Sequence, residues 1–133
     1  MISLETVRDL ISSLDVTEDD HVYMSKLDAK KEQSIGCYHL NRGTAYHPSI
    51  GGSGTYESSD FSFLVHWNES PRETEAAAQL LFDKIAAVKD VTVNDTRILF
   101  ILPIQNGPID VDKDEHGICE YVIEATIYFE ERN

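Results

Sequence analysis

Hydrophobic and polar positions follow two different periods along the chain, and the changes of period predict its elements. Near the start, apolar residues recur at spacings of three and four, which predicts an amphipathic helix over 4–14 with Ser3 as its N-cap. A helix this short is marginal alone, so we expect its stripe to dock on the rest of the protein. The stripe consists of Leu4, Val7, Leu10, Ile11 and Leu14.

Two short strand patterns follow, at Val22–Met24 and about Ser34–Leu40, on either side of the polar segment Lys26–Gln33. We expect them to pair as a β-hairpin with a long charged tip. The next segment, Asn41–Gly54, holds four of the seven glycines and one of the four prolines. Loops longer than about 12 residues are usually functional or disordered, so this one is a candidate contact loop.

The stretch Leu64–Ile85 organises the rest of the chain, because it joins the best strand pattern to the longest helix pattern. A strand is predicted over Tyr56–Asn68, where aromatic and aliphatic residues alternate with polar ones. Ser70 then caps a helix over Pro71–Val88, with proline in its first position and Glu73 completing a capping box. The predicted apolar face contains Ala77, Ala78, Leu81, Ile85 and Val88, and the polar face contains Arg72, Glu75, Gln79 and Asp83.

The pattern in the last third of the chain predicts two strands joined by an acidic, turn-rich connection over Gln105–Gly117. Ile98–Ile104 is continuously apolar, as in a central strand covered on both faces, and Pro103 indicates where its pairing stops. Ile118–Glu130 alternates along its length. Its apolar face is Cys119, Tyr121, Ile123, Ala125, Ile127 and Phe129, and its other face is Glu120, Val122, Glu124, Thr126, Tyr128 and Glu130.

The predicted order is therefore α-β-β-β-α-β-β, which favours an α+β fold. We expect a single two-layer domain over residues 1–133, with a mixed or mostly antiparallel sheet and two helices packed on one face. A hydrophobic fraction of 41% is sufficient for a real core. No apolar run reaches the roughly 18 residues of a membrane span, and the N-terminus lacks a signal-peptide pattern. We expect Cys37 and Cys119 to be reduced thiols of a cytoplasmic product, with a pairing left open.

The chain is strongly acidic, with 24 acidic and 11 basic residues and a net charge of −13. A field of this sign opposes nonspecific binding to nucleic acid, because phosphate contacts need lysine and arginine. It suits an ordinary soluble protein, a decoy for a basic partner, or a wall past which DNA slides without sticking.

Candidate chemistry is sparse. The segment Asp110–Gly117 begins like a calcium loop, but Glu115 occupies the position of the turn glycine and Tyr121 that of the bidentate glutamate. A solvated acidic turn is the favoured interpretation, with a weak divalent cation site as the alternative. The matching positions are Asp110, Asp112 and Asp114.

Cys37 and His39 suggest a thiolate with a base, or two metal ligands, but no orienting acid lies near them in sequence. A half-buried strand pair is favoured, and an enzyme using these two residues is kept as a hypothesis. His47 and His66 are interpreted as polar surface or edge residues. The sequence therefore predicts no catalytic residues, no metal site and no cofactor.

Surfaces remain as the candidate sites. The candidate subunit-contact loop contains Arg42, Tyr46, His47 and Ile50. Glu120 and Glu124, with Glu130 further along, form a candidate acidic lumen or surface face. Arg72 and Glu75 form a candidate contact at the start of the second helix, although helix capping alone also explains the acidic start.

A family resemblance rests on the same central stretch, LVHWNESPRETEAAAQLLFDKI, preceded by the glycine-rich loop and by TYESSDFSF. It covers about Tyr46–Ile85 and is carried by His66-Trp67-Asn68, by Arg72-Glu73-Thr74-Glu75 and by the alanine-rich helix. The stretch resembles the minor capsid or tail terminator (tail completion) proteins of long-tailed bacteriophages and prophages of Gram-positive bacteria.

The resemblance implies a virion structural protein, made in the host cytoplasm, without catalytic residues. Proteins of this kind are similar in being small α+β subunits that assemble with themselves into a ring, expected to be a hexamer. The ring caps the tail-tube protein, stops its polymerisation and faces the head connector, while DNA passes through without specific binding. An acidic lumen would repel DNA phosphates. The alternative hypothesis is an acidic inhibitor or immunity-type protein that binds a basic partner.

Overall fold

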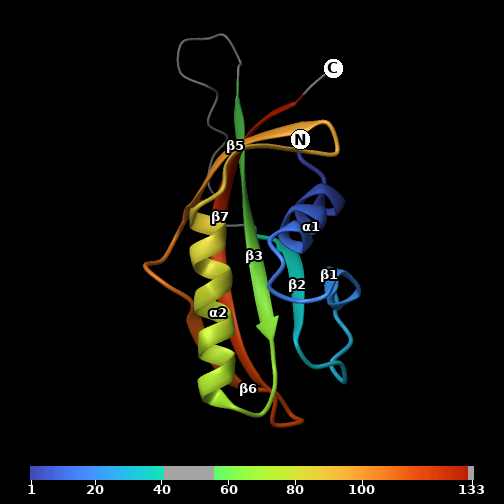
Figure 1. Cartoon of the computed structure of the whole chain (residues 1–133), viewed down its shortest axis with the longest axis vertical. Helices are drawn as coiled ribbons and strands as arrows, with labels where there is room; N and C mark the ends of the chain where they lie inside the picture. The colour runs from blue at the N-terminus through green and yellow to red at the C-terminus, as the bar shows by residue number, and fades with distance from the viewer. Residues whose placement is uncertain (41–55, 132–133) are drawn as a thin grey trace.

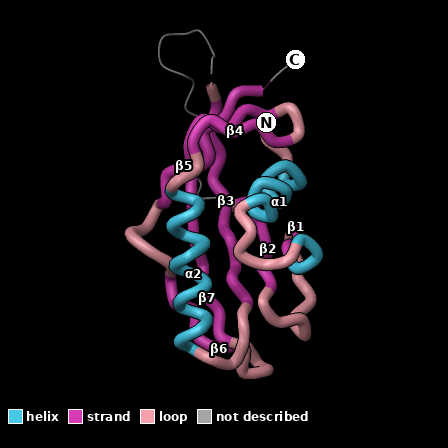
Figure 2. Tube along the Cα trace, in the orientation of Figure 1, coloured by secondary structure: helices cyan, strands magenta, loops and turns pink. Residues whose placement is uncertain are grey.

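The computed structural model describes residues 1–40 and 56–131, and these residues form two layers (Figure 1). One layer is a mixed, mostly antiparallel sheet, and both α-helices pack against one of its faces (Figure 2). The predicted α+β class is therefore confirmed. The elements are α1 (Leu4–Ser13), a 3-10 turn (Asp19–His21), β1 (Val22–Met24), β2 (Ser34–His39), β3 (Glu57–His66), α2 (Pro71–Ala86), β4 (Lys89–Val93), β5 (Thr96–Pro103), β6 (Ile109–Lys113) and β7 (Cys119–Glu131).

The first helix forms as its apolar spacing predicts. The Ser3 hydroxyl accepts a hydrogen bond from the Thr6 backbone N–H at 3.1 Å, which satisfies one of the unpaired donors at the helix start. Val7, Leu10 and Ile11 are fully buried. On the other side, the Arg8 Nε donates to the Val22 carbonyl at 2.9 Å and so fastens α1 to β1.

The sheet has the strand order β1-β2-β3-β7-β5-β4, with β6 paired to the first part of β7. β3 and β7 form its longest pairing, antiparallel from Glu57↔Phe129 to His66↔Glu120. The predicted hairpin between the first two strands is wrong, because β1 and β2 are parallel. Residues 25–33 carry the chain back to the start of β2, a return of only about 10 Å because β1 is three residues long.

The second helix is capped by Ser70, whose side chain accepts from the Glu73 backbone N–H at 3.2 Å. The reciprocal half of the predicted capping box does not form. Instead, the Ser70 N–H donates to Asn68 Oδ1 at 2.9 Å, and Asn68 Nδ2 donates to Glu73 Oε1 at 3.1 Å. The Asn68 side chain therefore links the Ser70 N–H to the Glu73 carboxylate, which were expected to bond each other directly.

The predicted apolar face of α2 is buried, with Ala78, Leu81 and Ile85 at 0% exposure. This face packs on β7, β5 and β3. Facing it are the fully buried Phe61 and Phe63 of β3, so the small alanine side chains allow a close approach to bulky aromatic residues. The buried side chains of both helices and of the sheet join one hydrophobic cluster.

β5 departs from its prediction, because it is covered on one face only. Ile98 and Ile101 are buried in the core, whereas Phe100 and Leu102 are 38% and 51% exposed on the other face. A register shift between Ile98 and Phe100 accompanies the change of face. The strand ends at Pro103 as expected. It lies next to the outer strand β4 and is therefore not central.

Two strands were not predicted. β4 joins β5 through Asn94 and Asp95, whose φ angles of 48° and 65° are both positive, as a two-residue hairpin loop requires. β6 lies inside the predicted acidic connection, where Ile109 pairs with Val122. No helix among the described residues is long and apolar enough to cross a bilayer.

Candidate functional site

The face of the sheet turned away from the helices, here called the open face, is the main candidate surface. No helix in the described part of the chain covers it (Figure 2). Strand alternation places successive side chains on opposite faces, so the register partners of β3, β7 and β5 meet here. The open face consists of Ser58, Asp60, Ser62, Leu64, Phe100, Leu102, Val122, Glu124, Thr126, Tyr128 and Glu130.

Aromatic residues occupy one end of the open face. Phe100 and Tyr128 are register partners across β5 and β7, and their rings stack with centroids 4.6 Å apart and planes inclined by 20°. The Tyr56 ring lies 6.3 Å from that of Tyr128. Together with the exposed Leu102, these residues form an apolar surface that the sequence analysis missed. The signal was present in the run Ile98–Ile104, but it was interpreted as a strand buried on both faces.

The three predicted acidic residues of β7 share the side of the strand opposite the helices, but their carboxylates have different surroundings. Glu120 is largely buried and places its Oε2 2.8 Å from His66 Nδ1. Glu130 pairs with Arg97 at 3.2 Å. Glu124 is half-buried on the open face. They therefore do not form one uninterrupted acidic row.

The predicted contact at the start of α2 is accessible. Arg72 and Glu75 are both exposed, and Glu75 Oε2 accepts a hydrogen bond from the Tyr121 hydroxyl at 3.3 Å. Burial, followed by the charges of Asp110 and Glu75, raises the pKa of Tyr121. A shallow pocket beside this helix start is lined by Pro71, Asp110, Asp112, Lys113, Cys119 and Tyr121. The other predicted contact, the loop with Arg42, Tyr46, His47 and Ile50, lies outside the described residues.

His66 is not the surface or edge residue that was predicted, because its side chain is fully buried. Its Nε2 lies 2.8 Å from the Ala29 carbonyl oxygen, and its Nδ1 faces Glu120 and, at 3.7 Å, Asp114 Oδ2. The alternating pattern of β3 correctly predicts which face of the sheet His66 lies on. It does not indicate that segments distant in sequence cover this end of that face.

Cys37 and His39 do not form a nucleophile and base. Burial raises the pKa of the Cys37 thiol to about 12, so the reactive thiolate is strongly disfavoured. His39 is exposed, and its ring lies 5.3 Å from that of Phe61. Both Cys37 and Cys119 are buried free thiols, so the structure contains no pairing between them.

In the calcium-like segment Asp110–Gly117, aspartate side chains accept hydrogen bonds from backbone N–H groups in or next to the same segment. Asp110 Oδ1 accepts from the Asp112 N–H at 2.8 Å, and Asp114 Oδ1 accepts from the His116 and Ile118 N–H groups at 2.9 Å each. Within the described residues, the three aspartates do not converge on a common point that could hold an ion. The acidic turn is thus mainly a structural feature.

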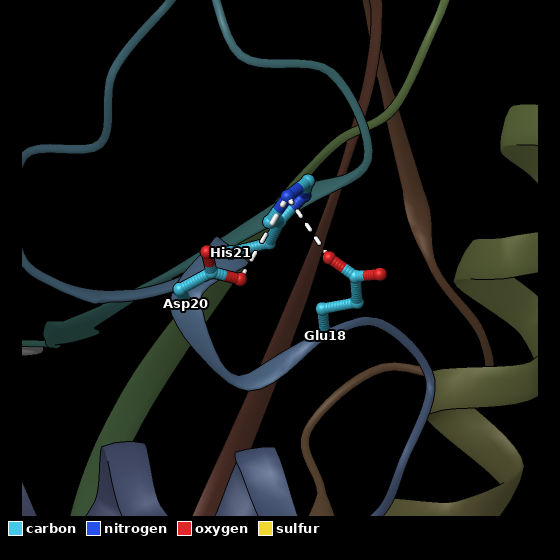
Figure 3. A group of neighbouring side chains, drawn as sticks. All are labelled: Glu18, Asp20 and His21. Atoms are coloured by element: carbon cyan, nitrogen blue, oxygen red, sulfur yellow. Dashed lines mark ion pairs between the residues drawn. The ribbon is translucent and has the colours of Figure 1, made fainter.

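Two groups of histidine and carboxylate side chains do converge within residues 1–40 and 56–131. In the first, His21 Nε2 lies 3.6 Å from Glu18 and 3.9 Å from Asp20 (Figure 3). The two carboxylate side chains are 80% and 73% exposed, so water solvates them whether or not an ion is present. The second group is His66 with Asp114 and Glu120.

Comparison with known proteins gives one family match for this chain. A family model described as bacteriophage tail terminator protein matches residues 10–131, well beyond the central stretch that carries the resemblance. No curated protein matches the chain. Because the family model covers nearly all of the sequence, the chain belongs to the bacteriophage tail terminator protein family.

Proposed function

We propose that this protein is the subunit of a ring, of six copies by our expectation, that caps the phage tail tube and stops its polymerisation. The observation that carries the proposal is the family match over residues 10–131, which makes the protein a structural component of the phage tail. The ring, the cap and the contact with the head connector go beyond that match and are supported by the surfaces described above.

The open face supplies a surface suited to a neighbouring subunit or to the tail tube. Phe100 and Leu102 expose apolar area beside Tyr128, and aromatic residues are enriched where protein partners meet. The outer strands of the sheet order are β1 and β4, and outer strands present backbone groups that a second chain can pair with. A structural subunit can use both features, one through side chains and the other through its backbone.

The acidic balance supports a channel through which DNA passes without binding. A net charge of −13 repels phosphate, and the repulsion acts over about 8–10 Å at physiological salt. Glu124 and Glu130 remain candidates for residues that line such a lumen. Glu120 and Glu130 contribute less to it than Glu124, because their carboxylates contact His66 and Arg97. No observation on the described residues favours the alternative of an acidic inhibitor.

The test is a polymerisation assay with the tail-tube protein of the same phage. Tube protein is assembled alone and with increasing amounts of the purified chain, and tube lengths are measured by electron microscopy. We expect shorter tubes that carry a cap at one end, and we expect Phe100→Ser to lose this effect. Tubes of unchanged length and bare ends at a molar excess of the chain would contradict the proposal. Leu80→Ser, which alters a similarly exposed apolar residue in the helix layer, is the matched control.

A further inference from the structure

One end of the sheet brings together three potential metal ligands from separate segments. His66 ends β3 and pairs in register with Glu120 of β7, which places both side chains on the same face. Asp114 comes from the turn between β6 and β7, closed by a hydrogen bond from its N–H to the Ile118 carbonyl at 2.9 Å. One donor atom from each residue lies within 4.8 Å of the other two.

The Nε2 atom of His66 carries a hydrogen. Its Nε2 lies 2.8 Å from the Ala29 carbonyl oxygen, and a carbonyl only accepts hydrogen bonds, so Nε2 carries a hydrogen. The other ring nitrogen, Nδ1, lies 2.8 Å from Glu120 Oε2 and 3.7 Å from Asp114 Oδ2. Nδ1 therefore either shares a proton with Glu120 or holds a lone pair directed at a cation. A histidine that donates its other N–H to a backbone carbonyl is the usual arrangement at metal sites.

Asp114 is held in an orientation that leaves one oxygen for a ligand. Its Oδ1 accepts two backbone N–H groups, from His116 and Ile118, while Oδ2 points towards His66. Only 16% of the Asp114 side chain is exposed, so water has limited access to it.

The charge of the cluster favours a divalent cation over a proton. With a protonated His66 and two carboxylates the group carries a net charge of −1, and in the described residues neither carboxylate pairs with a lysine or arginine. With a neutral imidazole and a divalent cation the group is neutral. Burying an uncompensated charge is unfavourable, so the neutral combination is the better one at this depth.

We propose that His66, Asp114 and Glu120 bind one divalent transition-metal ion. One imidazole nitrogen with two carboxylate oxygens is a donor set that suits Zn²⁺ or Mn²⁺. Donors that each lie about 2.0–2.2 Å from one tetrahedral ion are roughly 3.3–3.6 Å apart. The 3.7 Å pair is close to this separation, and the 2.8 Å pair, now at hydrogen-bond distance, would open by about 0.5 Å when the ion replaces the proton between Nδ1 and Glu120. The ion fixes the β6–β7 turn to the end of β3 and, through His66, to the backbone at Ala29. The site is independent of the proposed ring.

The test uses the chain after treatment with a chelator, titrated with ZnCl₂ and, separately, MgCl₂ by isothermal titration calorimetry. We expect one saturable Zn²⁺ site per chain that Mg²⁺ fills poorly. Asp114→Asn and Glu120→Gln keep the side-chain shapes, and each is expected to weaken Zn²⁺ binding by roughly tenfold or more, because even a residue that only orients a metal ligand contributes about 10–100-fold. Glu18→Gln with Asp20→Asn removes the exposed cluster of Figure 3 and should leave the saturable site unchanged.

A second measurement keeps the test decisive if the variants fold poorly. In wild-type protein labelled with ¹⁵N-histidine, Zn²⁺ should shift the Nδ1 resonance of His66 and leave its Nε2 protonated. Absence of a saturable site, Zn²⁺ affinities of Asp114→Asn and Glu120→Gln that equal that of the wild type, or an unmoved His66 resonance would each overturn the proposal. The cluster would then be a buried ion pair around an imidazolium.

Discussion

Phe100→Ser is expected to separate assembly from folding. Phe100 is 38% exposed and its ring stacks on that of Tyr128, so its loss removes an aromatic pair at the surface and leaves the buried core residues in place. An aromatic pair contributes about 0.5–1.5 kcal/mol beyond its area. Emptying a fully buried phenylalanine position such as Phe63 costs about 3–5 kcal/mol. We therefore expect the free energy of unfolding of Phe100→Ser to fall by roughly 1–2 kcal/mol.

The effect on assembly should be larger. If the open face is buried between subunits, Phe100 lies in a desolvated aromatic contact, where truncation costs about 2 kcal/mol or more. That corresponds to roughly 30-fold weaker association at each such contact. Sedimentation velocity over a concentration range measures the assembly, and urea unfolding followed by circular dichroism measures the stability of the same samples.

Leu80→Ser is the control for this comparison, since Leu80 is 45% exposed on α2, in the other layer. We expect it to assemble like the wild type. If Phe100→Ser assembled at wild-type concentrations while remaining folded, the open face would not be the contact surface. The same conclusion would follow if Leu80→Ser alone prevented assembly.

Three further predictions concern the fold. Leu81→Ala should lower the free energy of unfolding by about 2–5 kcal/mol, measured in urea, because Leu81 is fully buried between α2 and the sheet; a negligible change would contradict the core assignment. Ser70→Ala should cost about 0.5–2 kcal/mol through loss of the hydrogen bond to the Glu73 N–H, and Ser70→Asp should restore most of it; equal stability of the three proteins would show that the cap is unimportant. The pKa of Cys37 is raised from 9.0 to about 12, so the folded chain holds this proton more tightly than the unfolded chain. The protonated thiol therefore contributes fully to the free energy of unfolding below about pH 9, and this contribution is lost as the pH rises towards 12. Over this pH range, the free energy of unfolding measured in urea should fall less steeply in Cys37→Ala than in the wild type. Identical slopes would contradict the burial of the thiol.

Local sequence signals predict the elements whose structure depends on local chemistry. The cap at Ser70 and the buried stripe of α2 follow from residue types and a 3.6-residue period, and both are confirmed. The faces of β7 follow from its alternation. The strand β4 was also predictable, since Val91 and Val93 alternate and lead into Asn94-Asp95, a dipeptide that tolerates positive φ.

Other features depend on contacts between distant segments, which periodicity does not contain. The parallel pairing of β1 with β2 comes with a contact between α1 and β1, in which Arg8 donates to the Val22 carbonyl across 14 positions of sequence. His66 looks like a polar surface residue from its strand pattern. It is buried because Ala29, Asp114 and Glu120 converge on it from separate segments of the chain.

The apolar run in β5 shows a third kind of failure. A continuous hydrophobic strand in a globular protein is usually covered on both faces, so Phe100 and Leu102 were expected to be buried. They are exposed in the single chain. The same pattern fits a strand whose second face is covered only when subunits assemble, as the proposed function expects.

Negative-stain electron microscopy of the purified chain, alone and mixed with the tail-tube protein, tests the central claim most directly. The proposed function predicts rings with a central hole, six subunits around the hole, and one such ring at one end of each tube. Particles that stay monomeric at every concentration and leave the tube ends bare would contradict it.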